Sequence, residues 1–134
     1  MLLATVTVLV PTYEDGLAFF RDVLGMTVIE DTPLAPGKRW VVVAPSPGAG
    51  AALLLAVPSD ERQRTRVGNQ TGGRVGFFLH SDNFWGDCET LLRRGVNFLE
   101  KPRREAYGLV AVFVDPWGGK WDLLQPASGA LETP

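Results

Sequence analysis

The sequence has 134 residues, of which 46% are hydrophobic and 21% are charged, a composition typical of one folded domain and not of a disordered chain. The formal net charge is −2 at pH 7, so no basic excess indicates a nucleic-acid partner or an anionic membrane surface. A single cysteine, Cys88, excludes an internal disulfide and a cysteine metal cluster. Because we find neither a signal peptide nor an apolar run of roughly 20 residues, we expect a cytoplasmic protein without a membrane span.

The first half of the chain predicts a strand, a helix and three further strands. Residues 3–10 are rich in Val and Thr, which favours a strand. Thr12 is the predicted N-cap of a helix whose apolar residues recur at helical spacing, and Gly25 is its predicted C-terminal stop. Strands are predicted at 26–31, 39–45 and 51–58. The polar segment 59–73 then predicts a loop or one helical turn.

The second half predicts the same order of elements. A strand at 74–81 precedes a helix at 82–95, for which Asp82 is the predicted N-cap and Gly95 the C-cap. Further strands are predicted at 96–102, 108–116 and 119–126. The segment LGMTVIE at 24–30 matches RGVNFLE at 94–100, with a glycine and a final glutamate in the same places. We therefore predict an α+β fold of two tandem βαβββ modules in a single domain, at about 1–60 and 72–126, with a C-terminal tail at 127–134.

Several motifs resemble those of one known family. The helix segment LAFFRDVLGM, the closing DPWGGKWDLLQP and the repeated βαβββ unit resemble the vicinal oxygen chelate superfamily. Its members include glyoxalase I, extradiol dioxygenases, fosfomycin-resistance thiol transferases and bleomycin-resistance proteins. The resemblance covers nearly the whole chain. It implies that the two modules form a cup-shaped, partly open barrel, and that the chain forms a homodimer with two cups.

The resemblance also identifies the positions that hold a divalent metal in the enzymes of that family. One ligand comes from the first strand of each module and one acid from the last strand, and these positions fall on Thr5, Arg74 and Asp122. Thr5 is a poor ligand, and Arg74 has no lone pair to offer a metal. If the ligand position of the first strand were one residue earlier or later, it would fall on Ala4 or Val6, and neither can bind a metal. We therefore expect no cofactor, since the usual ligands of a divalent metal are absent.

Asp122 lies in a strand that is otherwise apolar, where a carboxylate needs a cation, a proton or several hydrogen bonds. Arg74 is a candidate partner, because in the metal enzymes both positions reach the same ion. Three interpretations stay open. The two residues form a structural ion pair, or Arg74 also holds an anionic or carbonyl-bearing ligand, or Arg74 points outward and Asp122 stands alone.

His80 is the only histidine, and it shares strand parity with Arg74 and Phe78. Because it sits at the end of the predicted strand, we interpret it as a surface residue. A contact or base at the mouth of a pocket, and a metal ligand together with Asp122, are the alternatives.

The remaining candidates are apolar or aromatic. Val112 and its alternate neighbours in the strand are expected to share a face with Asp122 and Phe78, where they form either a cavity for a small apolar ligand or a plain core. Trp40 opens the third strand and either lines a pocket or packs in the core. Trp121 is expected to pack under a helix, and Trp85 to be partly exposed.

Three functions remain open. We favour a metal-free protein that binds a small molecule in an apolar cup at the dimer interface, with Arg74 and Asp122 at the former metal position. The second is a lyase or dioxygenase with an atypical metal site at Asp122, completed by His80 or by the dimer partner. The third is a structural module that has lost its site. The sequence does not identify the ligand or decide whether the protein is an enzyme.

Overall fold

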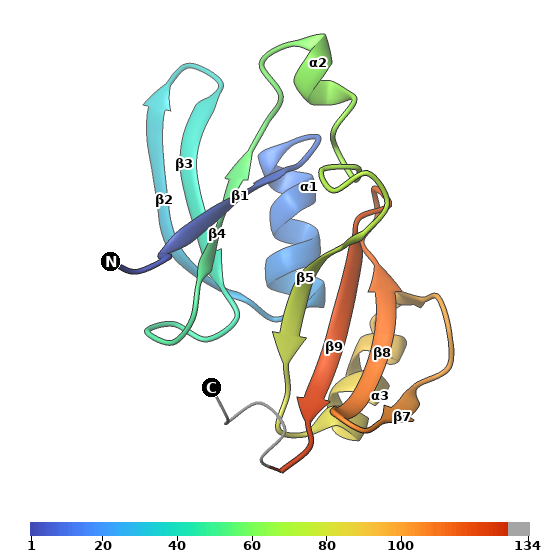
Figure 1. The fold of residues 1–134 in the computed structure, drawn as a ribbon. Coiled ribbons are helices and arrows are strands. Elements are labelled where there is room, and N and C mark those ends of the chain that lie inside the picture. Colours follow the sequence, from blue (N-terminus) through green and yellow to red (C-terminus); the bar gives the residue numbers. More distant parts are fainter. Residues whose placement is uncertain (129–134) are drawn as a thin grey trace. The chain divides into compact units, whose positions relative to one another are not determined.

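The helices and strands are divided between two units in a computed structural model that describes residues 1–128. One unit runs from Met1 to Gln70 and the other begins at Thr71. Each unit contains one open β-sheet and one main helix, and strands predominate in both (Figure 1). The predicted α+β class and the repeat of the βαβββ order are confirmed, and neither sheet closes into a barrel within the described residues. None of the helices in this part of the chain is long and apolar enough to cross a membrane.

The first unit contains a four-stranded sheet in the order β1-β4-β3-β2, in which β1 runs parallel to β4. Its elements are β1 (Thr5–Leu9), α1 (Tyr13–Leu17), η1 (Ala18–Val23), β2 (Thr27–Ala35), β3 (Lys38–Ala44), β4 (Ala52–Ala56) and α2 (Glu61–Arg64). Thr12 is the N-cap, as predicted, and its hydroxyl accepts a hydrogen bond from the Asp15 amide at 3.0 Å. The helix widens into a π-helical turn at η1 and ends at Gly25, whose φ of 77° is the left-handed conformation that glycine adopts without strain.

The helix covers one face of this sheet. Val8, Leu55 and Val41 are direct neighbours on three adjacent strands and are buried on that face. Gly16 lets the helix approach closely, because a Cβ at that position would lie 3.1 Å from side-chain atoms of both Leu55 and Val10. The opposite face, which we call the helix-free face of the first sheet, carries the alternate residues of the same strands.

The second unit contains a sheet in the order β5-β9-β8-β6, with the short strand β7 also paired to β8. Its elements are β5 (Val75–His80), α3 (Phe84–Arg93), β6 (Asn97–Phe98), β7 (Arg103–Glu105), β8 (Gly108–Val114) and β9 (Lys120–Pro126). The prediction of a strand over residues 96–102 is therefore wrong in its length, because the strand observed there, β6, contains only two residues. The Leu99 amide still donates to the Val112 carbonyl at 2.8 Å, but the chain then leaves the sheet before Pro102, which has no N–H to donate.

The start of α3 also differs from the prediction. Asn83, not Asp82, occupies the N-cap position, and its side chain makes no capping hydrogen bond. The Phe84 amide instead donates to Oε1 of Gln125, at 2.9 Å, from strand β9. The cap is supplied by a residue far along the chain, and for this reason the local sequence did not reveal it.

Helix α3 covers the face of the second sheet that holds the aromatic core (Figure 1). Trp121 is buried there, as predicted, and stacks against Phe77 and Phe113 with ring centroids 4.2 and 6.0 Å away. Its indole N–H donates to Oδ2 of the buried Asp115 at 3.1 Å. The prediction for Trp85 is also confirmed, because its side chain is largely exposed on α3.

Candidate functional site

The helix-free face of the second sheet brings together three of the residues predicted for the site. Phe78 on β5, Asp122 on β9 and Val112 on β8 are direct neighbours across the sheet. His80 lies in the next row, where it neighbours Leu124, and is exposed. Phe78 is 60% exposed, so its ring is available for contact with another molecule. The predicted common face of Phe78, Val112 and Asp122 is confirmed, and the two residues directly beside Asp122 on it are apolar.

Asp122 has an oxygen that lacks a partner. Its Oδ1 atom is buried and accepts no hydrogen bond from any residue between 1 and 128. Burial raises the pKa of this carboxyl group above its ordinary value, and the positive charge of Arg103 opposes that rise. Arg103 neighbours Val110 on β8, one row from Asp122 on the same face.

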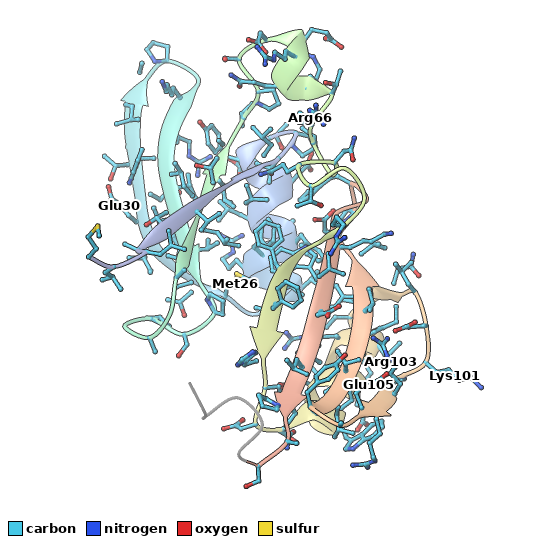
Figure 2. All side chains as sticks on the ribbon, in the orientation of Figure 1. Met26, Glu30, Arg66, Lys101, Arg103 and Glu105 are labelled. Carbon is cyan, nitrogen blue, oxygen red and sulfur yellow. The ribbon has the colours of Figure 1, made fainter. Side chains whose placement is uncertain are left out.

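The guanidinium of Arg103 is already engaged by two other carboxylates. It forms ion pairs with Glu100 and with Glu105, the latter at 2.8 Å. Figure 2 shows Arg103 beside Glu105, while Lys101 extends away from both. These ion pairs hold Arg103 in β7 and its neighbouring loop, and no hydrogen bond or ion pair from it to Asp122 is present in the described residues.

Arg74 does not pair with Asp122, which corrects the sequence-based hypothesis. Arg74 is exposed and precedes β5, whereas Phe78 is the residue opposite Asp122. A separation of four residues along a strand corresponds to about 13 Å. The pairing depends on the sheet register, which is interrupted between Val75 and Phe77, and counting from a sequence motif does not detect such an irregularity. Of the three interpretations, the structure agrees with the third, in which Arg74 points outward and Asp122 stands alone.

The possible metal donors on this face are too few to form a site. Asp122 and His80 lie in adjacent rows, and no group of three His, Cys, Asp or Glu side chains close enough to hold a metal occurs in residues 1–128. A divalent metal site usually needs three or four protein ligands. The residues present therefore do not fit a resident metal ion.

In the first unit, the predicted site residues lie on the helix-free face of the first sheet but in different rows. Thr5 neighbours Ala52, and Trp40 neighbours Thr32 near the opposite end of the sheet. Thr5 is exposed at the free edge of the sheet. Its hydroxyl and the Trp40 ring therefore do not form one cluster within this unit.

Trp40 lines a groove of about 540 Å³ at the end of the first sheet. Its side chain is 41% exposed. Apolar and aromatic residues make up much of the wall, and these are Tyr13, Leu34, Leu54, Leu55, Val57 and Pro58. Tyr13 and Leu34 were not identified from the sequence, because a helix start and a hairpin come together here only in the folded chain.

Arg39 forms part of the same groove with its charge already neutralised. Its guanidinium pairs with Asp31 at 2.6 Å and with Glu14, and it lies 5.2 Å from the centre of the Tyr13 ring. The Arg39 amide donates to the Tyr13 hydroxyl at 3.1 Å. The hydrogen bond from Arg39 is the main reason that the pKa of Asp31 is lowered. These contacts with Arg39 hold Tyr13 in place on the wall of the groove that Trp40 also lines.

Residues 2–123 match the sequence model of the Glyoxalase/Bleomycin resistance protein/Dioxygenase superfamily. The chain belongs to this superfamily. The resemblance seen in the closing motif and in the repeated module is therefore confirmed.

One sequence relative and two solved structures are each similar to this protein over most of its length. An uncharacterized protein of Shewanella frigidimarina is 43% identical over 121 residues, which is 90% of each sequence. The crystal structure of UcmS2 is similar with a TM-score of 0.79 and 28% identity, over 92% of this chain and 97% of that one. TnmS3, an antibiotic binding protein from Streptomyces sp. CB03234, is 30% identical with a TM-score of 0.74, over 95% and 96% of the two chains.

Proposed function

We propose that the protein is a metal-free member of the superfamily that binds an aromatic, largely apolar small molecule of antibiotic type. The observation that carries this proposal is the groove beside Trp40, because about 540 Å³ lies within the range of small-molecule sites and apolar and aromatic residues form much of its wall, with Lys38, Ser59 and Gln63 as polar groups. The similarity to TnmS3, an antibiotic binding protein, supports the same class of ligand.

The residues at the metal-ligand positions support a binding protein over a metal-dependent lyase or dioxygenase. Phe78 lies opposite Asp122 and offers no metal ligand, Thr5 is a poor ligand, and His80 is the nearest imidazole donor, one row from Asp122. We also infer a homodimer, because single-chain members of this length typically form one.

Three flat tricyclic compounds of similar shape test the proposal: acridone, which is neutral, 9-aminoacridine, which is a cation at neutral pH, and anthraquinone-2-sulfonate, an anion. We expect binding by isothermal titration calorimetry for at least one of them. Replacing Trp40 with Ala should weaken that binding by roughly tenfold or more, as loss of a central aromatic anchor does.

Trp85→Ala is the matched control, because Trp85 is an exposed tryptophan on α3 and does not line the groove. It should leave the affinity unchanged. Equal loss of affinity in both variants would show that binding does not involve the groove. If none of the three compounds binds to the unaltered protein, the proposal is wrong for aromatic ligands.

A further inference from the structure

The groove beside Trp40 lies where β3 and β4 cease to pair. Their ladder ends at the pair formed by Val41 and Leu55, whereas β3 begins three residues earlier, at Lys38. Those three residues remain paired to β2, and the groove is lined by side chains from them, from β4 and from the segment that follows β4. All of these residues belong to the first unit, so this unit by itself forms the groove.

A tight turn fixes the position of Lys38 on the wall of the groove. Lys38 pairs with Ala35 across a two-residue turn, in which Gly37 has a φ of 75° that glycine adopts without strain. Lys38 and Trp40 are two residues apart in β3, so their side chains point to the same face, with Cα atoms about 7 Å apart. The Lys38 ammonium is therefore within reach of a substituent on a ring system that stacks on Trp40.

The charged residues on the wall of the groove are both cations. They are Lys38 and Arg39, and no Asp or Glu lines the groove among the described residues. Arg39 is already neutralised by Asp31 and Glu14. Lys38 takes part in none of the ion pairs within residues 1–128. Its charge is therefore available to a ligand.

The other polar side chains of the groove add hydrogen-bond donors. Gln63 accepts a hydrogen bond from the Ser59 amide through Oε1 at 2.9 Å, which leaves its Nε2 group to donate. The acids that adjoin these residues in the chain are engaged elsewhere, because Asp60 accepts from the Gln63 amide at 2.8 Å and Glu61 pairs with Arg64 at 2.9 Å. A wall that offers donors and no carboxylate favours a ligand with an anionic group.

We propose that Lys38 binds an anionic substituent of the ligand, such as a sulfonate or carboxylate, while Trp40 contacts its rings, so that the groove selects aromatic anions over neutral and cationic aromatic compounds. The inference rests on the proposed function and names the chemical class of its ligand. The ammonium supplies a charge-assisted hydrogen bond. Apolar residues of the wall, such as Leu34 and Pro58, reduce the screening of this attraction by water.

The same three tricyclic compounds test this selectivity. We expect the unaltered protein to bind anthraquinone-2-sulfonate on the order of tenfold more tightly than acridone, which corresponds to one charged hydrogen bond, and to bind 9-aminoacridine less tightly than acridone. Raising the salt concentration from about 0.02 M to about 0.5 M should reduce the preference for the anion, because salt screens the charge of Lys38.

Substitutions of Lys38 separate the effect of its charge from differences between the ring systems of the probes. Lys38→Gln should reduce the preference for anthraquinone-2-sulfonate over acridone to roughly twofold or less, because the charged partner of the sulfonate is lost. Lys38→Arg keeps a cation at this position and should keep most of the preference.

Lys101→Gln is the matched control, since Lys101 is an exposed lysine of the second unit and does not line the groove. It removes the same charge from the chain and should keep the preference for anthraquinone-2-sulfonate. A thermal melt of each variant confirms that it is folded, which we expect because both lysines are exposed.

The possible outcomes separate this inference from the proposed function. If acridone binds to the unaltered protein as tightly as anthraquinone-2-sulfonate, or if Lys38→Gln keeps the preference, Lys38 does not select an anion, and Trp40-dependent binding of any probe still supports the proposed function. If no probe binds, both the proposed function and this inference fail. A preference for the anion that is lost in Lys38→Gln but kept in Lys101→Gln, in a protein whose binding needs Trp40, supports both.

Discussion

Two aspartates in the β8–β9 hairpin show how differently a protein uses the same side chain. The carboxylate of Asp115 is buried and accepts hydrogen bonds from the Trp117 and Gly119 amides and from the Trp121 indole, so it holds the closing turn together. Asp122, further along the same hairpin, has a buried oxygen with no partner in residues 1–128. The fold explains the first residue, whereas it gives the buried oxygen of the second no hydrogen bond from residues 1–128.

The raised pKa of Asp122 predicts how the free energy of unfolding depends on pH. Burial raises the pKa of Asp122 in the folded protein, so the native state keeps the proton to a higher pH than the unfolded chain does. The stability linked to this group is fully present below the unfolded pKa of about 3.9 and is lost as pH rises through the folded value. We expect Asp122→Asn to increase the free energy of unfolding by about 1 kcal/mol at pH 7 and to change it little below about pH 4. Urea unfolding at both pH values measures this difference.

Arg74→Ala provides the comparison. Because Arg74 is exposed and does not contact Asp122, we expect the free energy of unfolding to change by less than about 0.5 kcal/mol at either pH. A loss of roughly 3–5 kcal/mol would instead indicate the buried ion pair that the sequence suggested.

Strand β1 lies at an edge of its sheet, and a side chain completes its hydrogen bonding. Oε1 of Gln70 accepts a hydrogen bond from the Leu9 amide at 2.6 Å, and its Nε2 donates to the Thr7 carbonyl at 3.1 Å. The amide of Gln70 thus takes the place of a peptide group from a neighbouring strand. These two hydrogen bonds connect β1 to the last residue of the first unit, Gln70.

Removing this side chain should expose the edge of β1. We expect Gln70→Ala to increase the hydrogen-exchange rate of the Leu9 amide by roughly tenfold, because its acceptor is lost. Gln70→Glu keeps the acceptor for Leu9 but loses the donor for Thr7, so it should protect the Leu9 amide better than alanine does. Exchange measured by NMR tests the idea, and unchanged protection of Leu9 in Gln70→Ala would contradict it.

The molecule as a whole has the superfamily fold, and the sequence resemblance assigned its metal-ligand positions to Thr5, Arg74 and Asp122. Of Thr5, Arg74 and Asp122, only the aspartate is a good ligand for a divalent cation. The described residues contain no group of three suitable donors. A binding function that relies on apolar and aromatic surfaces follows more directly from these residues than a metal-dependent reaction does.

Metal analysis tests this conclusion on the intact protein. After incubation with Zn, Mn, Fe or Ni and exhaustive dialysis, we expect plasma mass spectrometry to detect far less than one metal ion per chain. Near-stoichiometric retention would contradict a metal-free site. Loss of the retained metal in Asp122→Ala and in His80→Ala would then identify the donors and return the lyase and dioxygenase functions to consideration.

The order of the elements was predictable because each signal is local. Alternating apolar residues mark strands, helical spacing marks helices, and Thr12, Gly25 and Gly95 act within one or two turns of their own positions. The repeat of these signals predicted two βαβββ modules, and the closing motif linked them to the superfamily.

The partners of particular side chains were not predictable, because they come from distant parts of the chain. The register of β5 against β9 places Phe78, and not Arg74, beside Asp122. Gln125 from β9 caps α3 in place of Asp82. The groove around Trp40 needs Tyr13 and Leu34 from two other elements. Hydrogen-bond register and packing between distant segments decide these contacts, and neither is a property of any short stretch of sequence.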